Sequence, residues 1–216
     1  MNIIAYPLHI QEASLILTNQ SALFWEQEKT LILSDLHLGK AAHFRKNGIA
    51  LPGQLALQDL SRLDTLIRHY DAAKIIIVGD LIHAGANKEV HLFTTLRQQH
   101  PQRTFILIRG NHDRISEQHL NDIGIDQVFE EHTIHKLSFA HQPSSLNGKF
   151  VISGHIHPGV VLMLQAKKRM RFPCYLVNEH QLILPAFSRF TGLDTSRVPE
   201  GSDCYAFYTE GIFKVP

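Results

Sequence analysis

Cysteine is scarce in this sequence, which holds only Cys174 and Cys204 among its 216 residues. Two thiols this far apart exclude the disulfide framework of a small secreted domain and a zinc site built from several thiolates. A reducing compartment is therefore expected, and we assign the protein to the cytoplasm. Long apolar runs are also missing: no stretch of about 18 apolar residues occurs, and no basic segment leads into an apolar run near Met1. We expect no membrane partner and no export.

An excess of charge of one sign is absent too, since 21 basic residues face 20 acidic ones. No field over the whole molecule would attract nucleic acid or a membrane, so any basic binding surface must be local. With 44% apolar residues in 216, the chain suits one compact domain over residues 1–216. Histidine is the compositional exception at 15 residues. Because imidazole binds transition metals and transfers protons near neutral pH, the placement of the histidines becomes the central question.

Short apolar runs alternate with amphipathic stretches in the first two thirds of the chain. The predicted buried parallel strands are residues 31–34, 74–78 and 104–108. The predicted crossover helices, which carry apolar positions at helical spacing, are residues 53–70 and 87–99. A shorter helix is expected between Asp113 and Gly124, and a hairpin at 14–27 ahead of the first core strand.

Beyond Asp126 the pattern changes to brief β-rich segments that indicate antiparallel or mixed strands. The expected strands are residues 134–141, 150–153, 160–164, 171–177, 181–184 and 204–209. Strand-helix units followed by strands predict an α/β fold with two facing mixed β-sheets flanked by helices, a four-layer sandwich. Residues 187–201 show no regular pattern. No repeat, low-complexity tract or long linker divides the chain.

Acidic, imidazole and amide side chains follow the predicted core strands at the point where each strand ends. The segments are Asp35-Leu36-His37, Gly79-Asp80, Gly110-Asn111-His112-Asp113 and Gly154-His155-Ile156-His157. In open α/β sheets, loops from separate strands converge beyond the carboxyl ends, so these four clusters are expected to meet in one crevice. A spacing of two residues lets both side chains of a pair reach inward from an extended loop. The glycines in these segments allow sharp turns and close approach of the backbone.

Carboxylate, imidazole and amide ligands without thiolate favour manganese, iron or zinc in a mixed oxygen and nitrogen site. The candidate ligands are Asp35, His37, Asp80, Asn111, His141, His155 and His157. They suffice for two divalent ions, with manganese preferred, if one carboxylate bridges the pair. Two ions about 3.5–4 Å apart activate a water and clamp both oxygens of an in-line displacement at phosphorus. The residues therefore predict hydrolysis of a phosphate ester.

The ordered motifs DxH, GD, GNHD, a lone His and GHxH resemble the calcineurin-like metallophosphoesterase superfamily over residues 35–157. The resemblance implies that one metal is held by Asp35, His37, Asp80 and His157 and the other by Asp80, Asn111, His141 and His155. It also implies that His112 lies beside the metals as the proton donor or phosphate-contacting group, with Asp113 orienting its ring. The lone His of the family is often followed by Gly, whereas Gln142 and Pro143 follow His141 here. The apolar run before it still places His141 at the end of a strand.

Further stretches are similar to a bacterial subfamily described as ligase-associated DNA-damage-response endonucleases, which are encoded beside an ATP-dependent DNA ligase and a helicase. The stretches are SDLHLGK at 34–40, FRKNG at 44–48, LPAF at 184–187 and FTG at 190–192. This resemblance implies DNA as the substrate, a function in repair, and the ligase and helicase as partners. It is an analogy about substrate, whereas the candidate ligands argue for the chemistry directly.

Basic and imidazole residues after the first two motifs are candidates for substrate binding. The candidates are Lys40, Arg45 and His83, with His43 as a weaker one. The two cations follow the first metal loop and are expected near the scissile phosphate. Phe44 can stack on a base, although a lone aromatic side chain more often packs. The densest basic run, at 167–171, is expected to be a solvated hairpin tip more than a nucleic-acid contact.

We interpret the sequence as a dinuclear-metal-dependent phosphodiesterase, a nuclease that acts on DNA in repair. One alternative is a phosphodiesterase of small nucleotides, which a lid over the metals would favour and a shallow cleft would not. Another is a metal-stabilised interaction subunit without turnover. The complete ligand set argues against the last alternative, because a binding module has no need of His112 beside seven ligands.

Overall fold

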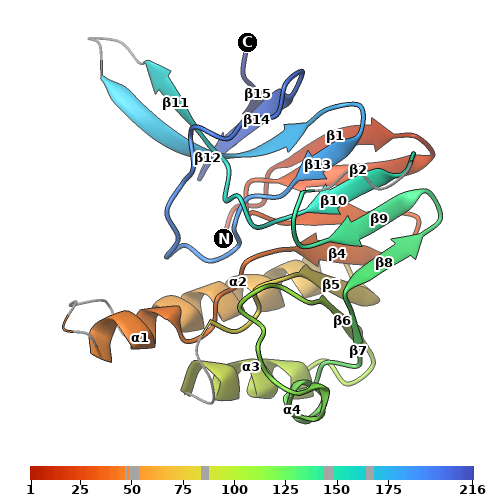
Figure 1. Ribbon diagram of the computed structural model, residues 1–216, viewed down its shortest axis with the longest axis vertical. Helices are drawn as coiled ribbons and strands as arrows, with labels where there is room; N and C mark the ends of the chain where they lie inside the picture. The colour runs from red at the N-terminus through yellow and green to blue at the C-terminus, as the bar shows by residue number, and fades with distance from the viewer. Residues whose placement is uncertain (47, 49–53, 84–87, 144–147, 164–167) are drawn as a thin grey trace.

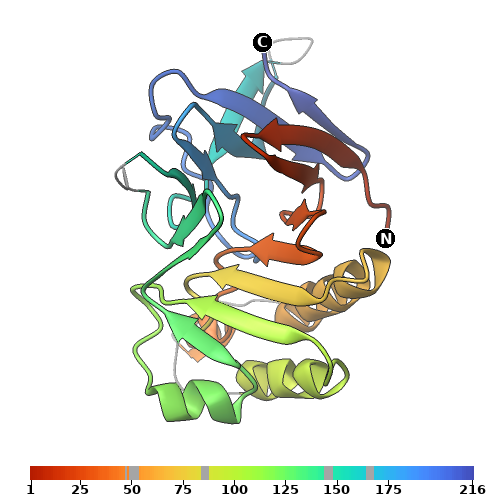
Figure 2. The same cartoon turned by 90° about the vertical axis from the view of Figure 1, so that its right-hand side faces the viewer.

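The computed structural model describes residues 1–46, 48, 54–83, 88–143, 148–163 and 168–216, without the side chains of His43 and Lys46. The described residues form two β-sheets that face each other, with helices on one side (Figure 1, Figure 2). No helix among them is long and apolar enough to cross a membrane.

The first sheet has seven strands whose order in space follows the chain. Its strands are β1 (Ala5–Ile10), β2 (Ala13–Thr18), β3 (Leu23–Trp25), β4 (Thr30–Leu33), β5 (Lys74–Val78), β6 (Thr104–Ile108) and β7 (Gln127–Phe129). Neighbours from β1 to β4 pair antiparallel, and neighbours from β4 to β7 pair parallel. β4, β5 and β6 are almost entirely buried, as expected for parallel strands that are covered on both faces. Their carboxyl ends therefore lie side by side.

Four helices of the described residues lie on the outer side of the first sheet (Figure 1, Figure 2). They are α1 (Lys40–Lys46), α2 (Leu55–His69), α3 (Lys88–Gln98) and α4 (Glu117–Asp122). α2 buries Leu60, Leu63 and Leu66 at helical spacing. These side chains join Ile75 of β5 and Phe93 of α3 in one apolar cluster, which fixes the helices on the sheet.

The second sheet has eight strands, in the order β15-β14-β12-β13-β10-β9-β8, with β11 paired to β12 outside this path. The strands are β8 (Glu131–Ile134), β9 (Leu137–Ala140), β10 (Phe150–Ser153), β11 (Gly159–Met163), β12 (Arg169–Val177), β13 (Gln181–Ile183), β14 (Asp203–Tyr208) and β15 (Gly211–Lys214). β10 pairs parallel with β9 and β13, and the other pairs are antiparallel. β11 and the start of β12 form a ribbon that projects from the body (Figure 1).

Apolar side chains from both sheets fill the space between them. Ile76 of β5 lies in one cluster with Phe139 of β9 and Ile152 of β10. Tyr175 of β12 is fully buried and donates a hydrogen bond from its hydroxyl to the Thr18 carbonyl in β2, at 2.8 Å. The predicted α/β class with two facing mixed sheets is confirmed.

The outer face of the second sheet is covered differently from that of the first. A small cluster on this face includes Cys174 and Leu176, and Ile156 from the loop after β10 packs against it. Among the described residues, the helices all lie on the other side of the molecule (Figure 2). A loop therefore takes the place of a helical layer outside the second sheet.

Two predicted elements are corrected by the structure. The strand expected at 134–141 is confirmed as β9 but begins only at Leu137, because the residues before it form the turn of a hairpin with β8, which was not predicted. His135 makes the turn with a φ of 53°, and no glycine in the sequence indicates it. The short helix expected from Asp113 begins only at Glu117, where Ser116 caps it by accepting a hydrogen bond from His119 N. α1, β1, β7 and β15 are absent from the sequence prediction.

Candidate metal centre

The loops that follow β4, β5, β6, β9 and β10 bring the candidate ligands together at the carboxyl ends of these strands. Among the described residues, two groups have ligand atoms that all lie within 4.8 Å of one another. One group is Asp35, His37 and His157, and the other is Asp80, His141 and His155. The geometry thus divides six of the seven candidates between two positions. Ligation itself stays a prediction.

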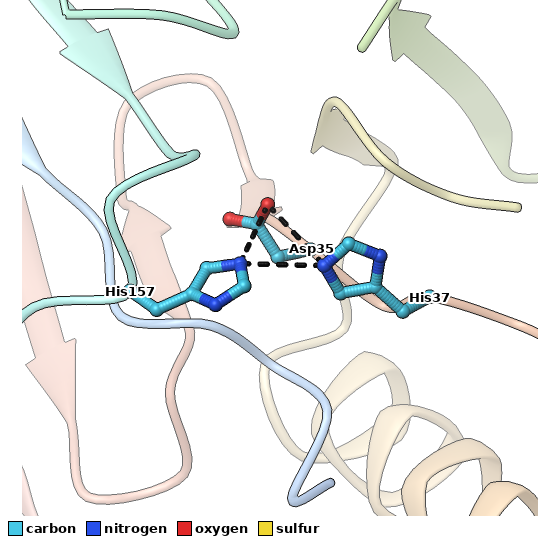
Figure 3. Close-up of side chains that lie close together, drawn as sticks. All are labelled: Asp35, His37 and His157. Atoms are coloured by element: carbon cyan, nitrogen blue, oxygen red, sulfur yellow. Dashed lines mark hydrogen bonds and ion pairs between the residues drawn. The ribbon is translucent and has the colours of Figure 1, made fainter. Parts of the chain in front are cut away.

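The first group is shown in Figure 3, where three side chains from the β4 and β10 loops point at one another. His157 Nε2 lies 3.2 Å from Asp35 Oδ1 and 3.3 Å from His37 Nε2. His37 Nε2 lies 3.9 Å from Asp35 Oδ1. Ligands about 2.0–2.2 Å from one ion are separated from each other by distances of this size. The three atoms can therefore share one cation.

The second group surrounds His141. Its Nε2 lies 3.5 Å from Asp80 Oδ2, 3.2 Å from His155 Nδ1 and 3.0 Å from Asn111 Oδ1. The seventh candidate, Asn111, therefore belongs here. Asp80 Oδ2 also lies 4.0 Å from His37 Nε2 of the first group. The Asp80 carboxylate is thus placed between the groups, where a bridging ligand would be needed.

The protonation and hydrogen bonding of these residues fit divalent ions. Asp35 Oδ1 is buried and accepts no hydrogen bond from any described residue, an arrangement that is costly unless a cation compensates it. Burial lowers the pKa of His37 to about 3, so the imidazole is neutral near pH 7, the form that binds a metal. Burial acts to raise the pKa of Asp80, but the contact with His141 outweighs it and lowers that pKa. The site is thereby supplied with an ionised Asp80 carboxylate and a neutral His37 imidazole.

Five of the candidate ligands have a left-handed backbone conformation. The angle φ is 56° at Asp35, 51° at His37, 50° at Asp80, 68° at His155 and 54° at His157. This region is uncommon for residues with a side chain and costs on the order of 1–2 kcal/mol per residue. Such conformations persist where the surrounding structure fixes them, and they cluster at functional sites. The sharp turns let alternate residues of one loop face the same point.

Close packing of these loops depends on glycine, as the sequence predicts. A Cβ atom on Gly79 would collide with the His141 ring, and one on Gly110 would collide with the Asp80 backbone and carboxylate. Gly79 also has a φ of 80°, which a larger residue adopts only with strain. The prediction that glycine permits close approach before the second and third motifs is confirmed.

Backbone amides hold the carboxylates of both ligand groups. Asp35 Oδ2 accepts a hydrogen bond from His155 N at 3.0 Å, and Asp80 Oδ1 accepts one from His112 N at 2.9 Å. Each carboxylate therefore has one oxygen bonded to the loop of a distant strand and the other turned toward imidazole nitrogens. These two hydrogen bonds therefore join the loops to one another.

Asp113 has different contacts from those expected. Its Oδ1 accepts a hydrogen bond from Ile82 N and its Oδ2 accepts one from Gly110 N, both at 2.9 Å. The expected hydrogen bond to the His112 ring is not formed among the described residues. Burial raises the pKa of Asp113 to about 6. The structure therefore corrects its role: Asp113 joins the loops after β5 and β6.

His112 and His83 border the open side of the centre. The His112 ring is exposed, with its centroid 5.7 Å from that of His37 and 4.6 Å from that of His83. The half-buried His83 ring lies 5.5 Å from that of His37. Two imidazoles outside both ligand groups thus lie within reach of a bound phosphate ester. Their roles stay predictions.

Lys40 is half-buried at the first position of α1. Burial lowers its pKa, and the charges of Asp35 and Asp80 oppose this shift. Its ammonium group therefore lies near both ligand groups, in keeping with the expected contact to substrate. The side chain of His43, the weaker candidate, lies outside the described residues.

Arg45 is held by a buried acid. Its Nη2 lies 3.2 Å from Glu89 Oε1, and Glu89 Oε2 accepts a hydrogen bond from Gly39 N at 2.7 Å. The pair therefore braces the first metal loop against α3, which is a structural role that the sequence did not indicate. Glu89 was missed because a single acid on an amphipathic helix belongs to no motif.

The remaining basic and aromatic candidates lie outside the centre. Phe44 packs edge-on against Phe190 with ring centroids 5.5 Å apart, which favours packing over base stacking. Arg169 and Arg171 are exposed on the projecting ribbon. Lys167, from the same basic run, lies outside the described residues.

Comparisons with known proteins relate the chain to a family and to solved structures. The sequence model described as calcineurin-like phosphoesterase matches residues 28–147. The crystal structure of the Pseudomonas putida nuclease MPE superposes with a TM-score of 0.84 at 28% identity, covering 98% of this chain and 100% of that chain. Yfce, a phosphoesterase from E. coli, gives a TM-score of 0.42 at 14% identity over 84% of this chain and 88% of that chain. No curated protein sequence matches the chain significantly.

Proposed function

The chain belongs to the calcineurin-like phosphoesterases, which are metal-dependent hydrolases, and from this premise we propose that it is a two-metal phosphodiesterase that cleaves DNA. One observation carries the proposal. The Asp80 carboxylate lies between the two ligand groups, 4.0 Å from His37 Nε2 and 3.5 Å from His141 Nε2. Two ions held close together require a shared ligand of this kind. Manganese is the proposed ion because carboxylate and amide oxygens suit it, and iron and zinc, which imidazole suits, are the alternatives.

The protein's own residues divide the chemical work in this proposal. When bound, the two ions would supply Lewis acidity at the phosphoryl oxygens. His112, exposed beside the ligands, donates a proton to the departing oxygen. His83 contacts a phosphoryl oxygen, and Lys40 adds a positive charge beside the metal loops. Asp113 positions the loop that carries His112 through its two backbone contacts.

A nucleic-acid strand is the proposed substrate on two grounds, and the resemblance to the ligase-associated subfamily makes DNA the proposed nucleic acid. The nuclease from Pseudomonas putida is similar over 98% of this chain, and Asn111 and His112 are exposed at the open side of the centre. A long strand can lie across an open site, whereas a small nucleotide is better held in an enclosed one. The small-nucleotide phosphodiesterase is therefore the second candidate.

The biological setting belongs to the same proposal. Similarity to the ligase-associated subfamily supports a function in DNA repair, with a DNA ligase and a helicase as partners. A reducing cytoplasm is the proposed location, and the free thiols of Cys174 and Cys204 support it.

The test is turnover by metal-stripped protein after Mn, Mg or Zn is added back. The substrates are a chromogenic diester, a chromogenic monoester, and single- and double-stranded DNA. We expect Mn to restore hydrolysis of the diester and of DNA. Cleavage of the monoester alone would contradict the proposal. If no substrate is turned over with any metal, the result would support the non-catalytic interaction subunit. Cleavage of cyclic or dinucleotide diesters, but not of DNA, would support the small-nucleotide enzyme.

A further inference from the structure

A cleft outside the metal centre opens where the β2–β3 turn, α2, β12 and the segment after β13 meet. Its volume is about 560 Å³, within the range of sites that bind a small ligand or one unit of a polymer. It continues into a neighbouring cleft of about 550 Å³, and Arg62 and Arg189 line both. The two connected clefts therefore suit an extended ligand better than a compact one.

One segment, residues 186–194, separates this cleft from the metal centre. On one side, Ser188 N donates a hydrogen bond to the Asp35 carbonyl at 3.1 Å, and Asp194 N donates one to the His157 carbonyl at 2.9 Å. Ser188 also lines the cleft on the other side. The 186–194 segment therefore lies between the cleft and a nucleic-acid strand bound at the metal centre.

The cleft is basic. Three arginines line it, Arg62, Arg171 and Arg189, and none of its lining residues is acidic. Arg171 and Arg189 form no ion pair with any residue that the structure describes, whereas Arg97, for example, pairs with Asp126 at 3.1 Å. Two exposed guanidinium groups are thus left for a ligand, and their planar donors match phosphate oxygens.

Arg62 lies at the base of the cleft, and one of its hydrogen-bond donors has no partner among the described residues. The residue is 6% exposed, its guanidinium lies 4.1 Å from the Phe187 ring centroid, and its Nη2 is 3.0 Å from Asp59 Oδ1. Its Nε is buried and has no hydrogen-bond partner among the described residues. Burial lowers the pKa of Arg62 to about 10; Asp59 opposes this shift and Arg189 adds to it. Two positive charges, on Arg62 and Arg189, therefore act on the single Asp59 carboxylate, which leaves an anion to be supplied.

We propose that this cleft binds a backbone phosphate of the nucleic-acid strand whose scissile diester lies at the metal centre. The inference rests on the proposed function and adds to it a second point of contact, on the far side of the 186–194 segment. Contacts to backbone phosphates carry no base specificity, so the cleft positions the strand and does not select its sequence. Arg171 and Arg189 are the residues that hold the phosphate, above the buried Arg62.

The test is binding of a labelled single-stranded phosphorothioate oligonucleotide to the metal-loaded full chain, measured by fluorescence anisotropy at several salt concentrations. The variant is Arg171→Gln with Arg189→Gln. For single strands, each phosphate contact contributes about 0.7 to the slope of log K against log salt, so we expect the slope to fall by about 1.4 and the affinity by about tenfold near 0.1 M salt. Hydrolysis of a small chromogenic diester should not change.

The matched control is Lys149→Gln with Arg169→Gln, which removes the same charge from exposed positions outside the cleft. An unchanged slope in the cleft variant, or an equal fall in the control, would overturn the proposal. Loss of diester hydrolysis would also overturn it, because the arginines would then belong to the metal centre. Inorganic phosphate that binds the wild type as tightly as the strand does would make this a small-anion site. A wild type that binds the strand through these arginines but never cleaves DNA would refute the nuclease proposal and leave the cleft standing.

Discussion

The metal centre has an enclosed half and an open half, and the two halves differ in whether their side chains can meet a substrate. In the enclosed half, the side chains of Asp35, His37 and His157 are 0%, 2% and 17% exposed. In the open half, Asn111 and His112 are exposed. Under the proposed function, the enclosed side chains bind a cation, whereas the exposed side chains of the open half can also contact a phosphate ester. Substitutions in the two halves should therefore impair activity in different ways.

Asp80 belongs to both halves, and its removal should have the largest effect. We expect Asp80→Ala to abolish activity and weaken both metals together, because a shared carboxylate is lost and two cations are left to repel each other. Metal content measured by mass spectrometry decides this. Two tightly bound ions per chain in the purified variant would show that Asp80 is not a bridge.

In the open half, His112→Ala should impair the reaction without releasing metal. A general acid is worth about 10²–10⁴-fold when the leaving group is a poor alkoxide and much less when it is a stable phenolate. We therefore expect a loss of this size on DNA and a small loss on a nitrophenyl diester. Rates on a series of leaving groups, with metal content as the control, measure it. A uniform loss on every substrate would assign His112 to charge stabilisation and not to proton donation.

In the enclosed half, His37→Ala should lower the occupancy of one metal position only. Because the remaining ligands still face that position, excess Mn should restore part of the activity on DNA and on the small diester alike. A titration of activity against Mn concentration gives the result. Failure to recover at any concentration would mean that His37 does more than bind metal.

At the border of the centre, Lys40→Gln should reduce DNA cleavage more than hydrolysis of a small diester, since only the strand needs its phosphates neutralised away from the metals. Arg45→Gln is the comparison, because its guanidinium pairs with buried Glu89. We expect that change mainly to lower thermal stability. Equal losses on both substrates for Lys40→Gln would place it in the metal site, and a selective DNA defect in Arg45→Gln would restore its expected role in binding.

The smallest effect concerns the backbone of the enclosed half. At a φ of 51°, alanine is strained and glycine is not, so metal-free His37→Gly should be more stable than metal-free His37→Ala by about 1 kcal/mol. Thermal or urea unfolding of the two variants measures the difference. Equal stability would show that the left-handed turn relaxes once the imidazole is gone.

The sequence predicts which side chains converge at the centre because those residues lie at strand ends, and metal binding by them stays a prediction. A buried apolar run such as Lys74–Val78 shows where its strand ends. The residues that follow the parallel strands then converge beyond the carboxyl ends of the sheet. The contacts of Asp113 were not predictable in this way. Its partners are backbone amides of Ile82 and Gly110, and a backbone amide leaves no mark in the sequence.

The missed elements have physical reasons of their own. β1 contains Pro7 and lies at the edge of its sheet, where proline is tolerated although it argues against a strand in the sequence. The β8–β9 turn uses His135 where glycine or asparagine is usual. The arginine cleft was invisible because Arg62, Arg171 and Arg189 are far apart in the chain and meet only through the packing of two sheets.

The left-handed turns also bear on how this chain could change over generations. At His37, His155 and His157, which have positive φ, the backbone favours glycine, and the chemistry of the imidazole opposes it. In a lineage that no longer uses the metals, selection would no longer retain these imidazole side chains. Its descendants would drift toward glycine at these positions, gaining stability as the reaction disappears. A DxH motif that has become DxG in a chain of this fold would then record an abandoned enzyme, and retained catalysis in such a chain would refute the idea.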